Sequence, residues 1–456
     1  MITNPTNTTI MKTNQHSRRD FLKNASAATA GIGALTVLPS SVVFGKPSPS
    51  DQINVALIGC RNRGFGSLKD HLGFKDTNCV AMCDIDSEVL NDKAADIQKT
   101  YKQSPKLYND YRKMLEQKDI DVVIIGTPDH WHCLNLVDSV AAGKDVYIEK
   151  PMANTIEECN IIVQASSYYD RIVQVGQQQR SNPSFIESMT LVKSGLIGPL
   201  RKVNLWANFN YGLGAKPAMD EPVPDGVDYD MWLGPAPSRP FNRNHFHGTW
   251  RHFWNYGGGM FSDWGVHLID MGLWVKDQVK APTRVLTYAG NNSGSEMQRD
   301  TFDTMSVIFP TKDYVINYDM TAGVQNGPYD NMYGVALIGD KGTIKVDRSG
   351  YRIIPEWDAE KQDFMIEAKQ SEKSHEAHSA HVRNFLDCVK SRQTPSCPPE
   401  VGRVAALHVH VANISARIGE PFLIWDDKNN SFANSEKANS YISPNYRSPW
   451  KLPKIG

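Results

Sequence analysis

The chain lacks three features that would each point to a different class of protein: a marked net charge, a long apolar run and a pattern of cysteines. Its 456 residues include 49 lysines and arginines and 50 aspartates and glutamates, which gives a formal net charge of −1. A nucleic-acid footprint needs a clustered basic surface, and a membrane span needs about 20 successive apolar residues. We therefore expect no nucleic-acid partner and no membrane insertion of the mature chain. Length and composition fit a globular protein of two domains with an appendage.

The seven cysteines exclude two further classes of protein. They are an odd number and widely scattered, without the CxxC pairs of a zinc site or the density of a disulfide scaffold. Their positions are Cys60, Cys79, Cys83, Cys133, Cys159, Cys388 and Cys397. We expect most of them to be buried thiols.

Residues 1–46 have the pattern of a targeting segment. The heptapeptide SRRDFLK from Ser17 to Lys23 precedes a weakly apolar run rich in alanine and glycine, from Ala25 to Val43. This resembles a twin-arginine export signal, with cleavage near Gly45. The alternative is a basic leader that carries the arginine pair by chance. The resemblance implies recognition by the Tat translocase, export to the periplasm or beyond, and transport of an already folded protein.

The first structural motif is a strand, a tight turn and a helix. The apolar run Ile53–Ile58 leads into Gly59, and a helix can start near Phe65. Gly59 and Gly64 fill the first and third places of the dinucleotide fingerprint GxGxxG, where glycines allow the turn and the packing of helix on strand. Arg61 stands in the second place, where it either loosens the cofactor or, with Arg63, makes charge-assisted contacts to the phosphates.

A second strand, Cys79–Cys83, ends in Asp84. An acidic residue at this distance from the glycine turn accepts hydrogen bonds from the ribose hydroxyls and repels a 2′-phosphate, so we expect NAD rather than NADP. The alternative role for Asp84 is to cap the helix that starts at Ser87.

Strands and helices continue to alternate up to Gly176. We expect helices around 110–116, 134–142 and 155–169, and strands at 121–125, 146–148 and 172–176. This alternation predicts a doubly wound parallel sheet over residues 51–178. His130 and His132 diverge on a strand or a helix, so we expect them to line the sheet mouth near the nicotinamide and to bind no metal.

The strand at 146–148 delivers Glu149, Lys150 and Pro151. Open α/β sheets bind ligands at the carboxyl ends of their strands, and the proline cannot continue a ladder. We therefore interpret Lys150 as the centre of an active site rather than as ordinary surface charge.

A second candidate segment begins at three glycines, Gly257 to Gly259. The helix predicted after them places Asp263, His267 and Asp270 at positions i, i+4 and i+7, on one face. A histidine between carboxylates is a candidate acid or base, because its pKa is already near neutral. The alternative is a structural histidine beside solvated acids.

The remaining chain, 179–456, predicts an α+β domain. A helix at 183–194 leads to a strand at 200–209, and later strands separated by turn residues predict an antiparallel sheet, with a supporting helix at 401–418. The aromatic-rich insertion 211–254 is either a carbohydrate-binding wall, a self-packed loop or a subunit contact. His375, His378 and His381 share one face of a helix start, and we expect them to be structural.

Two sets of motifs resemble the signatures of the Gfo/Idh/MocA (glucose-fructose oxidoreductase, inositol dehydrogenase, rhizopine catabolism) family. The first set is the glycine turn, Asp84, Thr127-Pro128 and Glu149-Lys150-Pro151, and the second is Asp263-x-x-x-His267-x-x-Asp270. The resemblance covers nearly the whole mature chain. It implies an NAD-binding Rossmann domain followed by an α+β domain whose large, mostly antiparallel open-faced sheet mediates a homo-oligomer, a dimer or a tetramer.

The resulting hypothesis is oxidation of a secondary hydroxyl of a sugar, glycoside or polyol by NAD. Lys150, His267 and Asp263 are the expected catalytic residues: His267 takes the hydroxyl proton, Lys150 holds the oxygen, and Asp263 orients His267 or a neighbouring hydroxyl. The expected cofactor-binding residues are Gly59, Arg61, Arg63, Gly64, Asp84, Thr127, Pro128, His132, Glu149 and Lys150. The expected substrate contacts are Arg180, Asp263, His267 and Asp270.

Export narrows this hypothesis, because a freely dissociating cofactor would be lost outside the cytoplasm. We therefore expect NAD to be tightly bound and recycled in place. Two rivals stay open: a redox-neutral glycosidase or lyase that acts through a keto-sugar, as in NAD-dependent N-acetylgalactosaminidases, and a non-catalytic sugar or nucleotide sensor.

Overall fold

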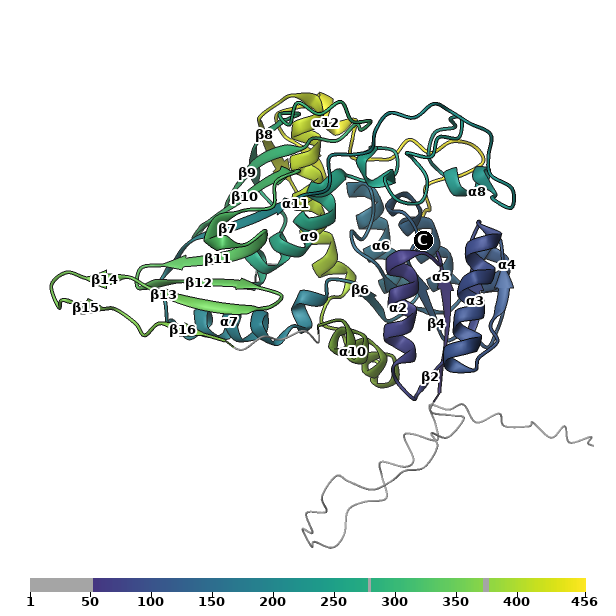
Figure 1. The fold of residues 1–456 in the computed structure, drawn as a ribbon, viewed down its shortest axis with the longest axis horizontal. Coiled ribbons are helices and arrows are strands. Elements are labelled where there is room, and N and C mark those ends of the chain that lie inside the picture. Colours follow the sequence, from purple (N-terminus) through teal and green to yellow (C-terminus); the bar gives the residue numbers. More distant parts are fainter. Residues whose placement is uncertain (1–51, 278–279, 372–376) are drawn as a thin grey trace, which may run out of the picture. The chain divides into compact units, whose positions relative to one another are not determined.

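The computed structural model describes residues 52–277, 280–371 and 377–456. The predicted signal segment, 1–46, and His375 lie outside these described residues. Two sheets organise the described chain, one in each half of the sequence (Figure 1).

The first sheet has six parallel strands in the order β3-β2-β1-β4-β5-β6. The strands are β1 (Ile53–Ile58), β2 (Thr77–Cys83), β3 (Lys106–Tyr108), β4 (Val122–Ile125), β5 (Asp145–Ile148) and β6 (Val173–Val175). The apolar runs of β4 and β5 are wholly buried, because helices cover both faces of the sheet. The order of the strands reverses between β1 and β4, and such a reversal creates a ligand-binding crevice at their carboxyl ends. The predicted doubly wound sheet is confirmed.

Five helices connect these strands: α2 (Asn62–Leu72), α3 (Ser87–Tyr101), α4 (Tyr111–Leu115), α5 (His132–Ala141) and α6 (Ile156–Tyr168). Side chains cap three of the helix starts. Asp86 accepts from two backbone amides of α3, and Thr155 and Asp110 each cap the helix that follows them. Asp86 therefore takes the capping role that was the alternative for Asp84.

The second sheet has ten strands in the order β16-β13-β12-β11-β7-β10-β9-β8-β17-β18. Its central members are β7 (Leu200–Phe209), β8 (Arg284–Gly290), β9 (Thr304–Pro310), β10 (Val315–Ala322), β11 (Tyr333–Gly339), β12 (Gly342–Asp347) and β13 (Gly350–Pro355). The edges add β16 (Lys369–Gln370), β17 (Phe422–Asp426) and β18 (Ser431–Phe432). Every pair is antiparallel except β7 with β10, so the predicted, mostly antiparallel sheet is confirmed.

Over β8, β9, β10 and β17 one face of this sheet is buried and the other is open, whereas β12 is buried along its whole length. Alternate residues of β9 point inward, where helix α9 (Gly259–Trp274) packs over the central strands. On the open face, Leu286, Ile308 and Phe422 stand in neighbouring register and are exposed. An oligomer contact on this face stays a prediction.

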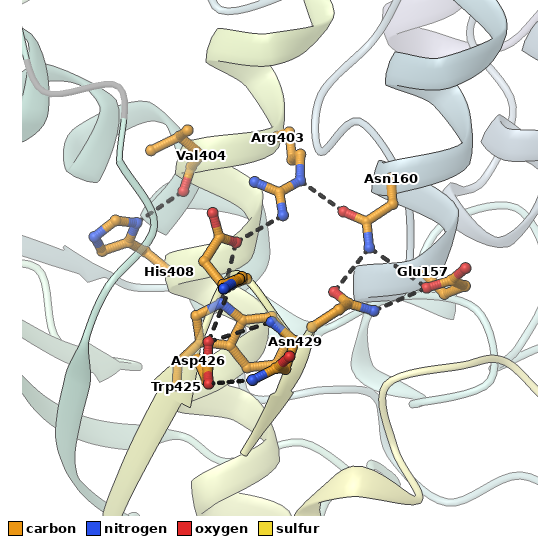
Figure 2. Close-up of polar contacts among 11 residues, drawn as sticks. Glu157, Asn160, Arg403, Val404, His408, Trp425, Asp426 and Asn429 are labelled. Atoms are coloured by element: carbon orange, nitrogen blue, oxygen red, sulfur yellow. Dashed lines mark hydrogen bonds and ion pairs between the residues drawn. The ribbon is translucent and has the colours of Figure 1, made fainter. Parts of the chain in front are cut away.

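Helix α11 (Pro399–Ile418) packs against both α6 and α9 and so connects the two halves. Figure 2 shows the polar side of this contact. Arg403 donates to Asn160 at 2.6 Å and to Asp427 at 2.8 Å, and Asn160 donates to Asn430. These contacts fix the turn between β17 and β18 to the Rossmann domain.

Several elements were not predicted from the sequence. They include the arm β14 (Trp357–Asp358) and β15 (Asp363–Phe364), the helix α8 (Tyr229–Leu233) inside the insertion, and the helix α12 (Glu436–Asn439). The helices α7 (Pro183–Lys193) and α10 (Ala377–Ser391) agree with the expected positions. Within the described residues, no helix combines the length and apolar character that crossing a membrane requires.

Candidate active site

Three glycines form the floor of a cavity at the carboxyl ends of β1 and β4. Gly59 has φ +86°, and a Cβ on Gly64 would lie 2.2 Å from the Gly59 carbonyl oxygen. A Cβ on Gly126 would lie 2.3 Å from the Cα of Gly64. Backbone therefore packs on backbone, and the N-terminus of α2 opens toward the cavity, as a pyrophosphate site requires. The predicted roles of Gly59 and Gly64 agree with this geometry, and Gly126 is a third member of the cradle.

The cavity extends from this floor into the second domain. Its volume is about 390 Å³, within the usual range for small-molecule sites. All ten predicted cofactor-binding positions except Gly64 line its wall, namely Gly59, Arg61, Arg63, Asp84, Thr127, Pro128, His132, Glu149 and Lys150. Gly64 lies beneath Gly59.

Asp84 is nearly buried at the end of β2. Its carboxylate accepts hydrogen bonds from the backbone amides of Cys60, at 2.6 Å, and Asp86, at 3.0 Å. Burial raises its pKa to about 6, against the lowering effect of these amides. Asp84 therefore fixes the glycine turn and also faces the cavity, where an acid can receive ribose hydroxyls.

The two arginines of the turn differ in their contacts. Arg63 donates through Nε to Glu149 at 3.0 Å and forms an ion pair with Asp70 at 2.7 Å. Arg61 is exposed at the rim of the cavity and forms no ion pair within the described part of the chain. Of the two, Arg61 is the residue placed to reach a phosphate, because the guanidinium of Arg63 is already held by two carboxylates.

His132 braces the segments that carry Thr127 and Lys150. Its Nδ1 lies 2.7 Å from the carbonyl oxygen of Pro151, and its Nε2 lies 3.0 Å from that of Thr127. Burial lowers its pKa to about 4, and the neutral ring donates to one of the two carbonyls. His130, expected at the same place, instead contacts the carbonyl of Trp232 and does not line the cavity.

Lys150 and Asp263 meet across the two domains. The Nζ of Lys150 lies 2.5 Å from Oδ1 of Asp263, and Arg251 donates to the same oxygen at 3.2 Å. Burial raises the pKa of Asp263, but the charges of Lys150 and Arg251 outweigh burial and hold it well below its usual range. Asp263 is therefore an ionised anchor for two cations, and within the described residues its side chain makes no hydrogen bond to His267. The alternative, that it orients a neighbouring hydroxyl, stays a prediction.

His267 lies one helical turn after Asp263 and faces the same cavity. In two other helices, His71 and His408 each place Nδ1 within 2.8 Å of the carbonyl four residues earlier, as Figure 2 shows for His408 and Val404. The equivalent carbonyl for His267 belongs to Asp263 and accepts from Lys150 at 3.0 Å.

The Nδ1 of His267 is buried without a hydrogen-bond partner among the described residues. Burial, reinforced by the charges of Lys150 and Arg348, keeps its pKa well below the usual value. The imidazole is neutral, and a neutral imidazole beside an ammonium group can accept a proton from a hydroxyl.

Arg180 and Asp270 do not belong to the cavity wall. The guanidinium of Arg180 holds both carboxylate oxygens of Asp270, with distances from 2.6 to 3.0 Å, and lies over the ring of Trp274. Asp270 does share a side of α9 with His267, but it is buried one turn further from the cavity. The two residues predicted as substrate contacts thus form an interior ion pair instead.

The insertion is at once a packed cluster and a cavity wall. Its buried aromatics pack on one another, with Trp232 stacked on Tyr229 and in edge contact with Phe246. Several of its members also line the cavity: Tyr211, Met231, Trp232, His247, Trp250 and Arg251. The alternatives of a self-packed loop and a ligand-binding wall are therefore compatible.

The insertion is fastened to the Rossmann domain beside Asp84. The backbone amide of Ser87 donates to the carbonyl of Gly226 at 3.0 Å, and that of Asp228 donates to the carbonyl of Ile85 at 2.9 Å. The Nε2 of His247 lies 2.6 Å from Oδ2 of Asp86. These contacts hold the insertion against the segment that follows Asp84, at the end of the cavity where the glycine turn lies.

Several polar cavity residues were not singled out from the sequence as site residues, among them Asp129, Gln178, Arg348 and His378, and Arg251 was expected only as part of the insertion. Asp129 stands in the predicted strand-end segment, and Arg251 in the insertion, so proximity to motifs could have indicated both. His378 was expected to be structural, but it lines the cavity and its neighbour His381 is buried. No sequence signal marks Arg348.

Comparisons with known proteins agree with this architecture. A family profile described as "Oxidoreductase family, NAD-binding Rossmann fold" matches residues 53–177, and one described as "Oxidoreductase family, C-terminal alpha/beta domain" matches residues 184–297. The aldose-aldose oxidoreductase from Caulobacter crescentus, solved with glycerol, has a TM-score of 0.61 at 18% identity over 82% of this chain and 100% of that protein. The WlbA dehydrogenase from Bordetella pertussis, solved with NADH and UDP-GlcNAcA, has a TM-score of 0.59 at 19% identity over 82% and 99% of the two chains. At these identities the likeness shows the fold.

Sequence relatives include a glycosyl hydrolase family 109 protein from Shewanella baltica, 32% identical over 201 residues, and an α-N-acetylgalactosaminidase from Shewanella oneidensis, 31% identical over the same length. Each alignment covers 40% of this chain and 44% of the relative, so the match spans less than half of those proteins. The two family profiles together span more than half of this chain. The protein therefore belongs to the Gfo/Idh/MocA family of oxidoreductases and carries that family's NAD-binding Rossmann domain.

Proposed function

We propose that this protein is an exported oxidoreductase that uses NAD to oxidise a secondary hydroxyl of a sugar, glycoside or polyol. One observation carries the proposal: the Lys150 ammonium is fixed by Asp263 beside the neutral His267, in the cavity that begins at the glycine turn. A cation and a base converging on one point suit the removal of a hydroxyl proton.

Two side chains act directly on the reacting hydroxyl. His267 accepts its proton, and Lys150 donates a hydrogen bond to its oxygen as negative charge develops there. Asp263 and Arg251 hold Lys150 and complete the charge balance around it. Bound NAD supplies the acceptor for the hydride that leaves the carbinol carbon.

Residues that would hold NAD are present in a fitting arrangement. The backbones of Gly59, Gly64 and Gly126 pack so closely that a Cβ on any of them would clash with neighbouring backbone, as the glycine turn of a pyrophosphate site requires, and Asp84 lines the same cavity. Glu149 and Thr127 line the wall next to Lys150, where the nicotinamide would lie.

The fastened insertion supports the expectation that NAD stays bound between turnovers. Three contacts, which involve Ser87, Asp228 and His247, hold the insertion against the Rossmann domain beside Asp84. A retained cofactor needs to be recycled in place, by a second substrate or within one redox-neutral reaction. That requirement also agrees with the predicted export.

The sequence relatives favour one second candidate, a redox-neutral glycosidase that acts through a keto-sugar. The glycosyl hydrolase family 109 proteins match this chain over 201 residues at up to 32% identity. Both candidates begin with the same proton removal at His267 and differ in the fate of the keto-sugar. A non-catalytic sensor fits less well, because it has no need of the convergent Lys150 and His267.

Two measurements test the proposal. The purified protein is denatured and the supernatant assayed for nucleotide, and we expect near-equimolar NAD. The NAD-loaded protein is then screened with sugars, polyols and aryl glycosides while cofactor absorbance and phenol release are monitored. Net change at the nicotinamide with free sugars supports the oxidoreductase, and glycoside cleavage without net change supports the glycosidase. A protein that carries no NAD and alters none of these compounds would contradict both.

A further inference from the structure

Arg348 is a cation of the cavity without a carboxylate. It lies in the turn between β12 and β13 and lines the cavity wall together with His267 and Gln178. Its guanidinium lies over the ring of Trp264, 4.8 Å from the centroid, and 5.9 Å from that of Tyr333. The two aromatic faces hold it in place.

The other buried or half-buried cations of the cavity are neutralised. Arg63 pairs with Glu149 and Asp70, and Lys150 and Arg251 share Asp263. Arg348 forms no ion pair with any residue of 52–277, 280–371 or 377–456. The polar contact of its guanidinium is with a neutral side chain: in the amide orientation that satisfies both of its ends, Gln178 accepts from Nη2 of Arg348 at 3.2 Å and from His378 at 3.1 Å.

Part of the hydrogen-bonding capacity of Arg348 is also unused. Its Nε is buried without a partner among the described residues. The nearby imidazoles, His267 and His378, have lowered pKa values, with burial as the main cause and the charge of Arg348 contributing. They remain neutral and offer it no negative charge.

A guanidinium cannot lose its proton at physiological pH, and a buried charge without a counter-charge is costly. The compensating anion must then come from a ligand. The phosphates of NAD belong at the glycine turn and the start of α2, whereas Arg348 enters the cavity from the second domain beside His267. The anion is therefore expected on the substrate.

We propose that Arg348 binds an acidic group of the substrate, so that the enzyme acts on a sugar bearing a carboxylate or a sulfate ester rather than on a neutral sugar. The planar fork of a guanidinium matches both groups through paired N–H···O hydrogen bonds. Trp264 and Tyr333 hold the fork at the cavity wall, and Gln178 fixes one of its edges. This inference rests on the proposed function, because it takes the cavity to be a sugar site.

The test measures the binding of matched sugars to the NAD-loaded protein by calorimetry. The probes are a neutral aldose, the uronic acid of the same configuration and a sulfate ester of the aldose. Each probe is screened as the free sugar and as the methyl glycoside. We expect at least one acidic probe to bind about 10- to 100-fold more tightly than its neutral counterpart, the range of a charge-assisted contact. The uronic acid and the sulfate ester distinguish the two sources of the anion.

Two substitutions of Arg348 assign the effect to this residue. Arg348→Gln should abolish the preference for the acidic probe while leaving the affinity for NAD unchanged. Arg348→Lys keeps the charge without the fork, and should keep part of the preference and lose it as salt is raised. Arg201→Gln is the matched control, because Arg201 is exposed outside the cavity and pairs with Asp340. Circular dichroism and thermal unfolding verify that each variant is folded.

The outcomes separate this inference from the proposed function. Equal binding of neutral and acidic probes, or an unchanged preference in both Arg348 variants, would overturn it. Loss of NAD affinity in Arg348→Gln without a change in sugar preference would assign its anion to the cofactor and also overturn it. Oxidation of neutral sugars alone would leave the proposed function standing without this inference. Binding of an acidic sugar that depends on Arg348, with no redox change, would support this inference and count against the proposed function.

Discussion

The Nζ of Lys150 lies 2.5 Å from Oδ1 of Asp263 and 3.0 Å from the backbone oxygen of the same residue. One amine at the end of β5 thus makes both a side-chain and a main-chain contact with the start of α9. The carbonyl that accepts this main-chain contact lies four residues before His267, at the position that binds Nδ1 of a helical histidine in His71 and His408. In α9 that position is taken by Lys150, and Nδ1 of His267 has no hydrogen-bond partner among the described residues.

Replacement of Lys150 tests the catalytic assignment. Lys150→Met should lower kcat by at least about 10³-fold, because the hydrogen bond to the reacting oxygen is lost. Arg251 still pairs with Asp263, so we expect the fold and the NAD content to persist. Steady-state turnover with the best substrate, together with nucleotide content after denaturation, measures both effects.

The control for this variant is a similar triad outside the cavity. Asp76 is shared by Lys390, at 2.5 Å, and Arg383, at 2.9 Å, just as Asp263 is shared by Lys150 and Arg251. Lys390→Met should leave kcat unchanged. Full turnover in Lys150→Met, or an equal loss in both variants, would remove Lys150 from the reaction.

Two glycines of α2 provide a paired test of the cofactor cradle. A Cβ on Gly64 would lie 2.2 Å from the Gly59 carbonyl oxygen, whereas a Cβ on Gly66 meets nothing closer than Nη1 of Arg63, at 3.5 Å. Gly64→Ala should lose NAD and destabilise the fold by about 1–3 kcal/mol through overpacking. Gly66→Ala should keep NAD and gain about 0.5–1 kcal/mol, because alanine restricts the unfolded chain. The two measurements are the nucleotide content and the free energy of unfolding of each variant by chemical denaturation. Equal NAD content and equal stability in the two variants would contradict the proposed cradle.

Much of the Rossmann domain can be predicted from local sequence. The apolar run Ile53–Ile58 and the glycines after it can form little else, and the strand has the predicted bounds. Asp263 and His267 were predicted to share a helix face, and both line the cavity. In these cases the spacing within one element decides the outcome.

Contacts between elements that are distant in the sequence could not be predicted from the spacing within one element. Asp270 has the helical spacing of a site residue, but the partner that buries it, Arg180, lies 90 positions earlier. Arg348 sits in an ordinary polar turn and reaches the cavity because β12 and β13 end beside Trp264. Such placements depend on how the second sheet docks on α9, which no local pattern encodes.

Asp129 should make stability depend on pH. It is buried in the cavity wall, and burial raises its pKa from about 3.8 to about 8, against the lowering effect of Arg251 and Lys150. The folded state therefore holds a proton that the unfolded chain has lost between about pH 4 and pH 8. Stability should fall as pH rises through this window, with a slope of up to about 1.4 kcal/mol per pH unit for one proton.

The variant Asp129→Asn removes this proton linkage. It should unfold with a shallower pH dependence than the parent protein, and its advantage over the parent should grow toward pH 8. Urea denaturation between pH 4 and pH 8, at equal NAD content, measures the two curves. Parallel curves would show that Asp129 is ionised in the folded protein across the range.

The fastened insertion can be locked to test whether it retains the cofactor. A Cβ on Gly226 would lie 3.8 Å from the Cβ of Ser87, the mean separation across a disulfide. The double variant Ser87→Cys/Gly226→Cys should therefore form a reversible bridge between the insertion and the Rossmann domain. Gly226 has φ +76°, so its cysteine costs about 1–2 kcal/mol of strain. The seven natural cysteines are all buried and free, which limits wrong pairing.

If the insertion must open for NAD to enter or leave, oxidation of the two cysteines should trap the site in the state, NAD-free or NAD-loaded, in which the disulfide forms. NAD-free protein, once oxidised, should take up NAD more than about tenfold more slowly than the same protein after reduction. NAD-loaded protein, once oxidised, should keep its nucleotide through dialysis that depletes the reduced form. The controls are the reduced double variant and the oxidised single variant Ser87→Cys, because neither of them carries the bridge. Equal exchange in the bridged and reduced forms would mean that NAD passes by another route, and that retention owes nothing to the contacts of Ser87, Asp86 and His247.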